Sequence, residues 1–236
     1  MAHGSDLPMR GVSQPSAEAV LSSRQLRVSR HPVVLHTLSR LRSIDTGAAE
    51  FSGLVAELSR LLAYEALADL TVQPVKVQTP MESTGGFHLA ERVGLVPILR
   101  AGLGMVASFR ELIPNAEVWH LGLYRDEHSL EPVEYYNRLP SQTNVQTCFV
   151  LDPMLATGGS ACGATRILQN WGVRRIKYVG LIAAPYGVQQ LTDQFPDVDI
   201  HVAALDRELD ERGYILPGLG DAGDRQFGTG SSPAGS

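Results

Sequence analysis

Cysteine is scarce in this chain of 236 residues, which contains two, Cys148 and Cys162. They have neither CxxC spacing nor enough partners for a disulfide framework. Cys148 lies in an apolar run, where a buried, reduced thiol is the favoured interpretation. The seven histidines form no HxxxH pair and no cluster with cysteine, so no protein metal site is expected. A reducing, cytoplasmic compartment is the resulting expectation.

Long apolar runs are lacking too. No segment approaches the roughly 18 apolar residues of a membrane span, and the first residues lack the apolar core of a signal peptide, so no membrane partner is expected. The net charge of -5 has the opposite sign to the basic surface of most nucleic-acid-binding proteins, so no nucleic-acid partner is expected either. The hydrophobic fraction of 44% is typical of a globular protein.

One domain is predicted over residues 25–229, with flexible segments at residues 1–24 and 230–236. Helical spacing of apolar residues predicts a helix over 47–70, capped by Asp45 or Thr46, and a shorter one over 32–41. In residues 71–92 alternating valines surround a proline and two glycines follow, which predicts a projecting hairpin, here called the arm.

From residue 93 onward the pattern alternates between strands and helices. Strands are expected at residues 93–99, 118–123, 149–151, 176–183 and 200–205, and helices at 103–112, 160–171 and 188–195. This alternation predicts an α/β fold, a mostly parallel sheet flanked by helices. Such sheets bind ligands beyond the carboxyl ends of their strands. The polar segment 124–144 is predicted to be a long functional loop.

A buried strand leads through Asp152 and a Gly-rich segment into a helix. Residues 157–160 would point successive backbone N–H groups outward at the positive end of that helix, an arrangement that binds a terminal phosphate. Gly158 and Gly159 allow close approach to the backbone, and Asp152, about one sugar away, can accept hydrogen bonds from ribose hydroxyls. The alternative is a turn that merely caps the helix. The segment is neither a Walker loop nor a GxGxxG turn.

Residues 152–160 read Asp-Pro-Met-Leu-Ala-Thr-Gly-Gly-Ser. This string resembles the phosphoribosyl-diphosphate motif of type I phosphoribosyltransferases. With Pro153 at the position of the usual second acid, it is most similar to the version in the uracil phosphoribosyltransferase family. The resemblance implies a single α/β domain with a C-terminal hood, at about residues 206–229, and a projecting β-arm. It also implies that the motif binds phosphoribosyl diphosphate, through Asp152, Pro153, Met154, Leu155, Ala156, Thr157, Gly158, Gly159 and Ser160.

Arg100 follows another predicted strand and precedes a turn of small residues. By itself it is better interpreted as an exposed helix cap than as an anion ligand. The same string serves as the diphosphate-binding loop of the family, and the resemblance therefore favours the ligand. Many members have a cis peptide there, expected here at Arg100–Ala101. The resemblance makes Arg125 a second diphosphate contact. It makes residues 129–136 a flap that excludes water, the alternative being a solvated connector.

The Gly-rich segment 213–229 is too apolar for a disordered tail. Its apolar residues include Tyr214, Ile215, Leu219 and Phe227. With no helix or strand period in its sequence, it is predicted to be a hood whose backbone groups hydrogen-bond a flat polar ring. The resemblance implies that Ile215, Gly220, Asp221 and Ala222 bind uracil through the backbone, and that Asp221 also reaches phosphoribosyl diphosphate.

The implied activity is transfer of a phosphoribosyl group to uracil, giving UMP and diphosphate. No Ser-His or Cys-His nucleophile occurs in these motifs, so direct displacement is the economical mechanism. Asp152, Asp221 and Arg125 are the expected catalytic residues, and Mg²⁺ carried by the diphosphate is the expected cofactor. A homo-oligomer, dimer or tetramer, is expected, with residues 71–86 as an interface. Allosteric activation by GTP, which occurs in some members, is left open. The alternatives are transfer to another base and a nucleotide-sensing, RNA-binding regulator on the same fold.

Overall fold

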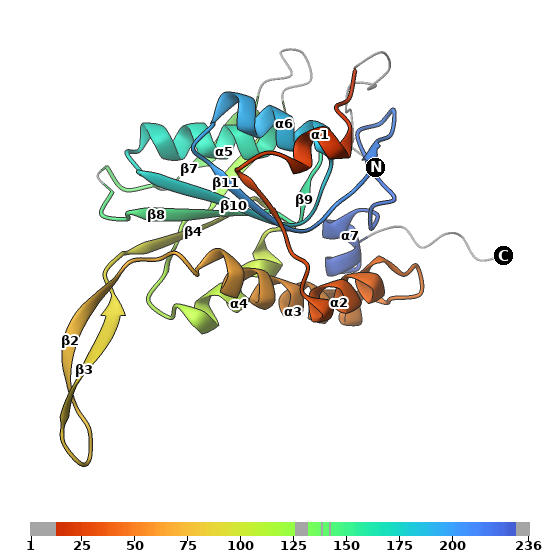
Figure 1. The fold of residues 1–236 in the computed structure, drawn as a ribbon. Helices are drawn as coiled ribbons and strands as arrows, with labels where there is room; N and C mark the ends of the chain where they lie inside the picture. Colours follow the sequence, from red (N-terminus) through yellow and green to blue (C-terminus); the bar gives the residue numbers. More distant parts are fainter. Residues whose placement is uncertain (1–12, 126–131, 138, 142, 230–236) are drawn as a thin grey trace.

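A mostly parallel sheet of seven strands forms the centre of the protein (Figure 1). The computed structural model describes residues 13–125, 132–137, 139–141 and 143–229. The strand order is β1-β11-β10-β8-β4-β5, with β9 paired to β10. The strands are β1 (Leu26–Val28), β4 (Val93–Pro97), β5 (Glu117–Val118), β8 (Thr147–Leu151), β9 (Met154–Leu155), β10 (Arg175–Ala183) and β11 (Asp199–Leu205). The pairings within this sheet are parallel, which confirms the predicted α/β class.

Helices cover both faces of the sheet (Figure 1). One face carries α1 (Ala17–Leu21), α5 (Gly159–Asn170) and α6 (Pro185–Gln194); the other carries α2 (Pro32–Arg42), α3 (Ala48–Ala66), α4 (Leu103–Leu112) and α7 (Ala222–Phe227). Strand β8 shows why the central strands are apolar throughout. Phe149 and Leu151 join the buried cluster beneath α3 and α4, while Cys148 and Val150 join the cluster beneath α5 and α6. Alternate side chains therefore enter two different cores.

The predicted helices are confirmed, with differences at their ends. Helix α4 has the predicted bounds, whereas α3 ends at Ala66 and its N-cap is Gly47. The prediction that Asp45 or Thr46 caps α3 is wrong, because Gly47 holds the N-cap position and no side chain accepts from the first turn; the Thr46 hydroxyl donates to the carbonyl oxygen of Arg40 at 2.6 Å. Among the described residues, no helix combines the length and apolar character that crossing a membrane requires.

The predicted strand over residues 118–123 is two strands. β5 ends at Val118 in the main sheet, and β6 (Leu121–Arg125) pairs instead with β7 (Pro132–Asn137) as an antiparallel hairpin. The prediction of one strand is wrong because Trp119 extends the apolar run across the break, which only the polar His120 marks in the sequence. β7 also lies within the segment predicted to be an irregular loop.

Residues 13–24 belong to the fold, although the sequence analysis assigned them to a flexible segment. Val20 of α1 is buried in the cluster that includes α6, and the Gln14 side-chain amide bonds the backbone N–H and carbonyl of Leu209. The rest of that segment, residues 1–12, and the predicted tail, 230–236, lie outside the described residues.

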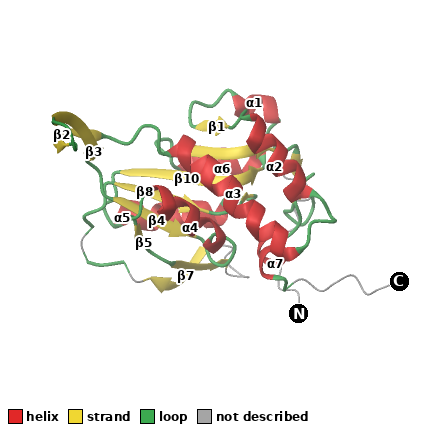
Figure 2. Ribbon diagram, turned by 90° about the horizontal axis from the view of Figure 1, so that it is seen from below, coloured by secondary structure: helices red, strands yellow, loops and turns green. Residues whose placement is uncertain are grey.

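The arm is a two-stranded hairpin that projects from the body, as predicted (Figures 1 and 2). β2 (Val72–Gln78) and β3 (Ser83–Leu89) pair along their whole length. Five large apolar side chains on the arm are exposed: Val72, Val77, Met81, Phe87 and Leu89.

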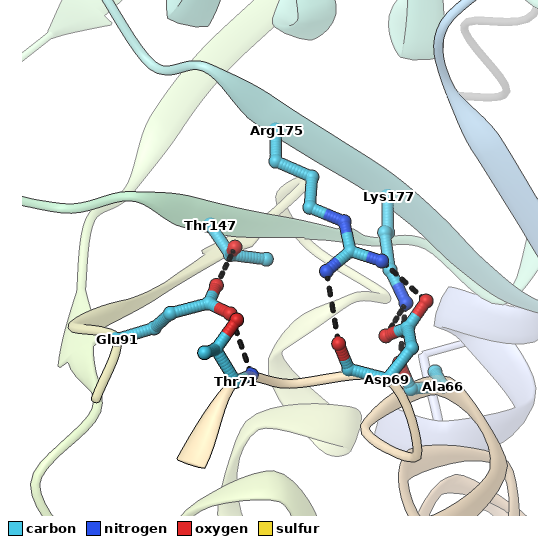
Figure 3. A network of polar contacts seen from close by, with 7 residues as sticks. All are labelled: Ala66, Asp69, Thr71, Glu91, Thr147, Arg175 and Lys177. Carbon is cyan, nitrogen blue, oxygen red and sulfur yellow. Dashed lines mark hydrogen bonds and ion pairs between the residues drawn. The ribbon is translucent and has the colours of Figure 1, made fainter. Parts of the chain in front are cut away.

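Both ends of the arm are bonded to the sheet at its base (Figure 3). Glu91, which follows β3, accepts hydrogen bonds from the backbone N–H of Thr71 at 2.7 Å and from the hydroxyl of Thr147 in β8 at 2.5 Å. These contacts fix the two points at which the arm leaves the body, so its direction is set by the central strands.

A buried cation completes this network (Figure 3). The side chain of Lys177 in β10 is fully buried and donates to Asp69 at 2.5 Å and to the carbonyl oxygen of Ala66 at 2.7 Å. Arg175 donates to the same Asp69 carboxylate. Burial lowers the pKa of Lys177, since the charged form loses its hydration. Asp69 is the carboxylate that compensates for this loss.

We therefore expect Asp69→Ala to lower the free energy of unfolding by about 2 kcal/mol. A fully buried pair would lose more, but the Asp69 side chain is 46% exposed and water screens it. The matched control is Glu111→Ala, which removes an ion pair with Arg60 that is exposed on both sides and should cost less than about 0.5 kcal/mol. Urea unfolding measures both. Equal losses of unfolding free energy in the two variants would show that Asp69 does not compensate for the burial of the Lys177 charge.

Candidate active site

The predicted phosphate loop, residues 152–160, follows β8 and enters α5 at the carboxyl edge of the sheet. Gly158 is the N-cap of α5 and has a φ of 84°, a left-handed conformation that favours glycine. Gly187 of α6 packs against the loop so closely that a Cβ there would lie 2.3 Å from the carbonyl oxygen of Ala156. The N–H groups in the first turn of a helix have no intrahelical partner, so the loop can present them to an anion.

A cavity of about 190 Å³ opens over this loop. Its lining comprises Asp152, Met154, Leu155, Ala156, Thr157, Gly158, Gly159, Ser160, Ala161 and Gly213. Nine of these ten residues come from the loop and the start of α5, and Gly213 comes from the hood. The sequence-predicted phosphate and ribose residues other than Pro153 therefore surround one space, with the hood at its edge.

Asp152 is one of the residues that line this cavity. Its carboxylate accepts a long hydrogen bond, 3.4 Å, from the backbone N–H of Met154, and its carbonyl oxygen accepts one of 2.9 Å from the Tyr178 hydroxyl. Burial raises the pKa of Asp152 to about 7, because the charged carboxylate is poorly solvated there. Donors such as ribose hydroxyls would stabilise the charged form.

This raised pKa predicts a pH-dependent stability. The folded-state pKa of about 7 exceeds the ordinary value of 3.8. The contribution of Asp152 to the free energy of unfolding is therefore most favourable below pH 3.8 and is lost as the pH rises to 7. We expect Asp152→Asn to be more stable than the wild type at pH 8, by about 2 kcal/mol after allowance for partial hydration, and equally stable at pH 4. Urea unfolding of both proteins at the two pH values measures this, and other titrating groups cancel in the comparison. A pH-independent difference would contradict it.

The diphosphate loop, residues 98–102, follows the neighbouring strand β4. It lies directly against the end of β8: the Ile98 N–H donates to the carbonyl oxygen of Leu151 at 2.9 Å, and a Cβ on Gly102 would lie 2.2 Å from that oxygen. The cis peptide bond is Leu99–Arg100. The predicted bond, Arg100–Ala101, is therefore wrong by one residue.

Arg100 bonds the hood. Its guanidinium donates to the Asp224 carboxylate at 3.1 Å and to the Thr229 hydroxyl at 3.4 Å, and its side chain is 60% exposed. Gln226 adds a bond of 3.4 Å to the carbonyl oxygen of Ala101. Arg100 is thus no simple helix cap. It is an accessible cation at the junction between the diphosphate loop and the hood.

The hood, residues 206–229, contains β12 (Glu208–Leu209), β13 (Ile215–Leu216) and α7. The sequence of residues 213–229 shows no period because elements of two to six residues are too short to leave one. Asp221 is the N-cap of α7, and its side chain accepts from the Asp224 N–H at 2.8 Å. Gly220 and Asp221 are exposed, whereas Ile215 and Ala222 are buried.

The predicted flap and its arginine are described only in part. Arg125 is the last residue of β6 and pairs with Pro132 of β7, and its diphosphate role stays a prediction. Of the predicted flap, residues 129–131 lie outside the described residues and residues 132–136 belong to β7. A bridge between Leu121 and Ile98 places the start of β6 beside the diphosphate loop.

The sequence analysis missed several polar side chains around the site. Tyr178 bonds the backbone of Asp152 from within an apolar strand, and Asp224 pairs with Arg100 from the hood. Arg42 and Arg225 form further contacts described below. Tyr178, Asp224 and Arg225 are polar residues in apolar or Gly-rich stretches, which is the signal that could have identified them, whereas Arg42 lies among other polar residues and carries no such signal.

The phosphate loop, the diphosphate loop and the hood, which are far apart in the sequence, thus meet at one edge of the sheet. The family model for uracil phosphoribosyltransferase matches residues 28–229, nearly all of the described chain. The chain belongs to the uracil phosphoribosyltransferase family. Members of this family that resemble it include the uracil phosphoribosyltransferase of Roseiflexus castenholzii, 58% identical over 207 residues, which covers 88% of this chain and 100% of the relative. That of Bacillus licheniformis is 51% identical over 200 residues, 84% of this chain and 96% of the relative.

A solved structure has the same fold. The AQ2163 protein from Aquifex aeolicus is 37% identical and has a TM-score of 0.82, with 88% of this chain and 100% of that chain covered. The predicted family resemblance is therefore confirmed. The arm, the hood and the two loops described above all lie within the matched residues.

Proposed function

We propose that the protein transfers the 5-phosphoribosyl group of phosphoribosyl diphosphate to uracil, forming UMP and diphosphate in pyrimidine salvage. The observation that carries this proposal is the meeting of the phosphate loop, the diphosphate loop and the hood at one edge of the sheet. Arg100 bonds the hood, the diphosphate loop contacts the end of β8, and Gly213 of the hood lines the cavity over the phosphate loop. A phosphate, a leaving group and a base can then be bound side by side.

In this reaction the bond between the anomeric carbon and diphosphate breaks, the bond to N1 of uracil forms, and the N1 proton is lost. The backbone of residues 156–160 would bind the 5′-phosphate and Asp152 the ribose hydroxyls. Arg100 and Arg125 would stabilise the charge on the departing diphosphate. Asp221, exposed beside the uracil-binding backbone, is the proposed acceptor of the N1 proton.

Mg²⁺ is the proposed cofactor. The described residues contain no group of three or more His, Cys, Asp or Glu side chains that could hold a metal. The carboxylates of Asp152 and Asp221 are nevertheless oxygen donors of the kind that Mg²⁺ accepts alongside phosphate oxygens and water. When bound, the metal would neutralise charge on the diphosphate. The residues present thus fit an ion that arrives with its substrate.

A cytoplasmic location is proposed from the cysteines. Cys148 and Cys162 are buried free thiols. Burial raises their pKa values to about 12 and about 11, so neither is a reactive thiolate at neutral pH. Unpaired structural cysteines are typical of proteins in a reducing compartment.

The test is a transfer assay with radiolabelled uracil, phosphoribosyl diphosphate and Mg²⁺. We expect labelled UMP and one equivalent of diphosphate, with unlabelled uracil competing and hypoxanthine, orotate and cytosine not competing, because a hood that matches the hydrogen bonds of uracil leaves buried groups unpaired with other bases. Transfer to one of the other bases instead would favour the first alternative. RNA binding without any transfer would favour the regulator, which the family relatives do not favour.

We also propose a homo-oligomer, dimer or tetramer, in which the arm contacts another subunit. The exposed apolar residues of the arm support this. Phe87→Ser, at a side chain that is 73% exposed, should weaken the assembly, while the control Ile44→Ser, at a residue 95% exposed in the α2–α3 connection, should not. Size-exclusion chromatography with light scattering measures the mass. A monomeric wild type would refute the proposal.

A further inference from the structure

Arg225 of α7 connects the hood to the α2–α3 connection, residues 43–47. Its guanidinium donates to the carbonyl oxygen of Leu219 within the hood at 2.7 Å. It also donates to three carbonyl oxygens at the end of α2 and in the connection: Leu41 at 3.0 Å, Ser43 at 2.6 Å and Thr46 at 3.3 Å. One planar side chain thus fixes the distance between the hood and the helical layer below the sheet.

The ring of Phe51 lies under this guanidinium. The central carbon of the Arg225 guanidinium is 4.4 Å from the ring centroid, and Phe51 is fully buried. The aromatic face excludes water from one side of the cation, which strengthens its hydrogen bonds to the carbonyls. A lysine ammonium cannot reproduce both the stacking and the forked donor geometry.

The hood backbone that Arg225 supports is the part proposed to bind uracil. Leu219, whose carbonyl it bonds, directly precedes Gly220, Asp221 and Ala222. Gly220 has a φ of 78°, and a Cβ there would lie 3.4 Å from the Cδ of Arg225. The aliphatic stem of the arginine therefore packs beneath the turn that leads into α7.

A second arginine, Arg42, holds Gly218, the residue before Leu219. Arg42 of α2 makes a forked pair with Asp206 at 2.8 and 2.5 Å and donates to the carbonyl oxygen of Gly218 at 2.6 Å. The Asp206 carboxylate, itself buried, accepts from the N–H of the same Gly218 at 2.9 Å. Both backbone groups of Gly218 are thus bonded to this ion pair.

We propose that Arg225, together with the Arg42–Asp206 pair, is a positioning element that sets the geometry of the uracil-binding backbone. The inference rests on the proposed function, since it assigns these residues to the uracil half of the site. The four contacts of Arg225 lie in the hood, α2 and the α2–α3 connection, away from the phosphate loop. Losing them displaces the groups that bind the base and leaves the groups that bind the 5′-phosphate in place.

The test compares steady-state kinetics of the wild type, Arg225→Lys and Arg225→Met, with KM measured separately for each substrate. Arg225→Lys should raise the KM for uracil about 10-fold and Arg225→Met about 100-fold, as bonds to the supporting backbone are lost. The KM for phosphoribosyl diphosphate should rise by a clearly smaller factor, at most about 3-fold, because α7 also bonds Arg100 and Ala101 of the diphosphate loop whereas the phosphate loop keeps its own contacts. Arg60→Lys, which alters an exposed arginine on α3, is the control and should match the wild type.

A loss of activity in which both KM values rise together would show a merely structural role and overturn the inference, as would wild-type uracil kinetics in Arg225→Lys. If Arg225→Met does not fold, Asp206→Asn, which weakens the Gly218 contacts, should raise the KM for uracil in the same selective way. An inactive wild type would instead refute the proposed function, so the two failures are distinguishable.

Discussion

Asp152→Ala is expected to keep its fold and to lose more than about 100-fold in kcat/KM, the typical cost of removing a contact that stabilises the transition state. Asp152 is the carboxylate that lines the cavity over the phosphate loop. In the proposed reaction positive charge develops on the ribose when the diphosphate leaves. A carboxylate held beside that sugar both orients its hydroxyls and stabilises the developing cation.

The measurement is steady-state kinetics with both substrates, accompanied by circular dichroism and urea unfolding. Because burial opposes the charge on this group, the alanine variant should be no less stable than the wild type at pH 8. A large loss of activity without a loss of stability separates a catalytic role from a structural one. Near-normal turnover would remove Asp152 from the mechanism.

Gly187→Ala is the second change with a large expected effect. The added Cβ would lie 2.3 Å from the carbonyl oxygen of Ala156 and 2.8 Å from that of Leu155. Both atoms belong to the backbone of the phosphate loop, so relief of the clash must move the loop itself. A displacement of about 1 Å in a positioning group can cost about 100-fold in rate, and we expect a loss of that size in kcat/KM for phosphoribosyl diphosphate.

Gly53→Ala is the matched control. Gly53 is exposed in α3, and a Cβ there would meet no atom within 4 Å. This variant should retain full activity and gain up to about 1 kcal/mol in unfolding free energy, because alanine is the better helix former. Steady-state kinetics compares the two variants. If Gly187→Ala has the same kcat/KM for phosphoribosyl diphosphate as Gly53→Ala, the close packing of α6 does not position the phosphate loop.

The features predicted correctly from the sequence are those that depend on neighbouring residues. The strand and helix around residues 152–160 follow from an apolar run, two glycines and a helical period, all between residues 147 and 171. The arm is similarly local, since its alternating valines and paired glycines belong to one hairpin. The resemblance of residues 152–160 to a family motif then indicated the family. From the family came the expectation that the phosphate loop, the diphosphate loop and the hood lie close together.

The features that were missed depend on contacts between distant residues. Arg225 bonds Leu41, and these residues are 184 positions apart. Arg100 and Asp224 are 124 positions apart. No periodicity or spacing encodes such pairs. The prediction of the α3 cap failed for a local reason: the helix begins one residue later, with Gly47 as its N-cap, and the Thr46 hydroxyl donates backwards to the carbonyl oxygen of Arg40.

The central claim, that one site binds a ribose phosphate, a leaving diphosphate and a uracil ring through these three segments, is tested most directly by a crystal structure with UMP, diphosphate and Mg²⁺. The 5′-phosphate should accept hydrogen bonds from backbone N–H groups of residues 156–160. The diphosphate should contact Arg100, and the uracil ring should bond the backbone of Ile215 and of residues 220–222. UMP bound elsewhere, or bound in this cavity with its base turned away from the hood, would contradict the account.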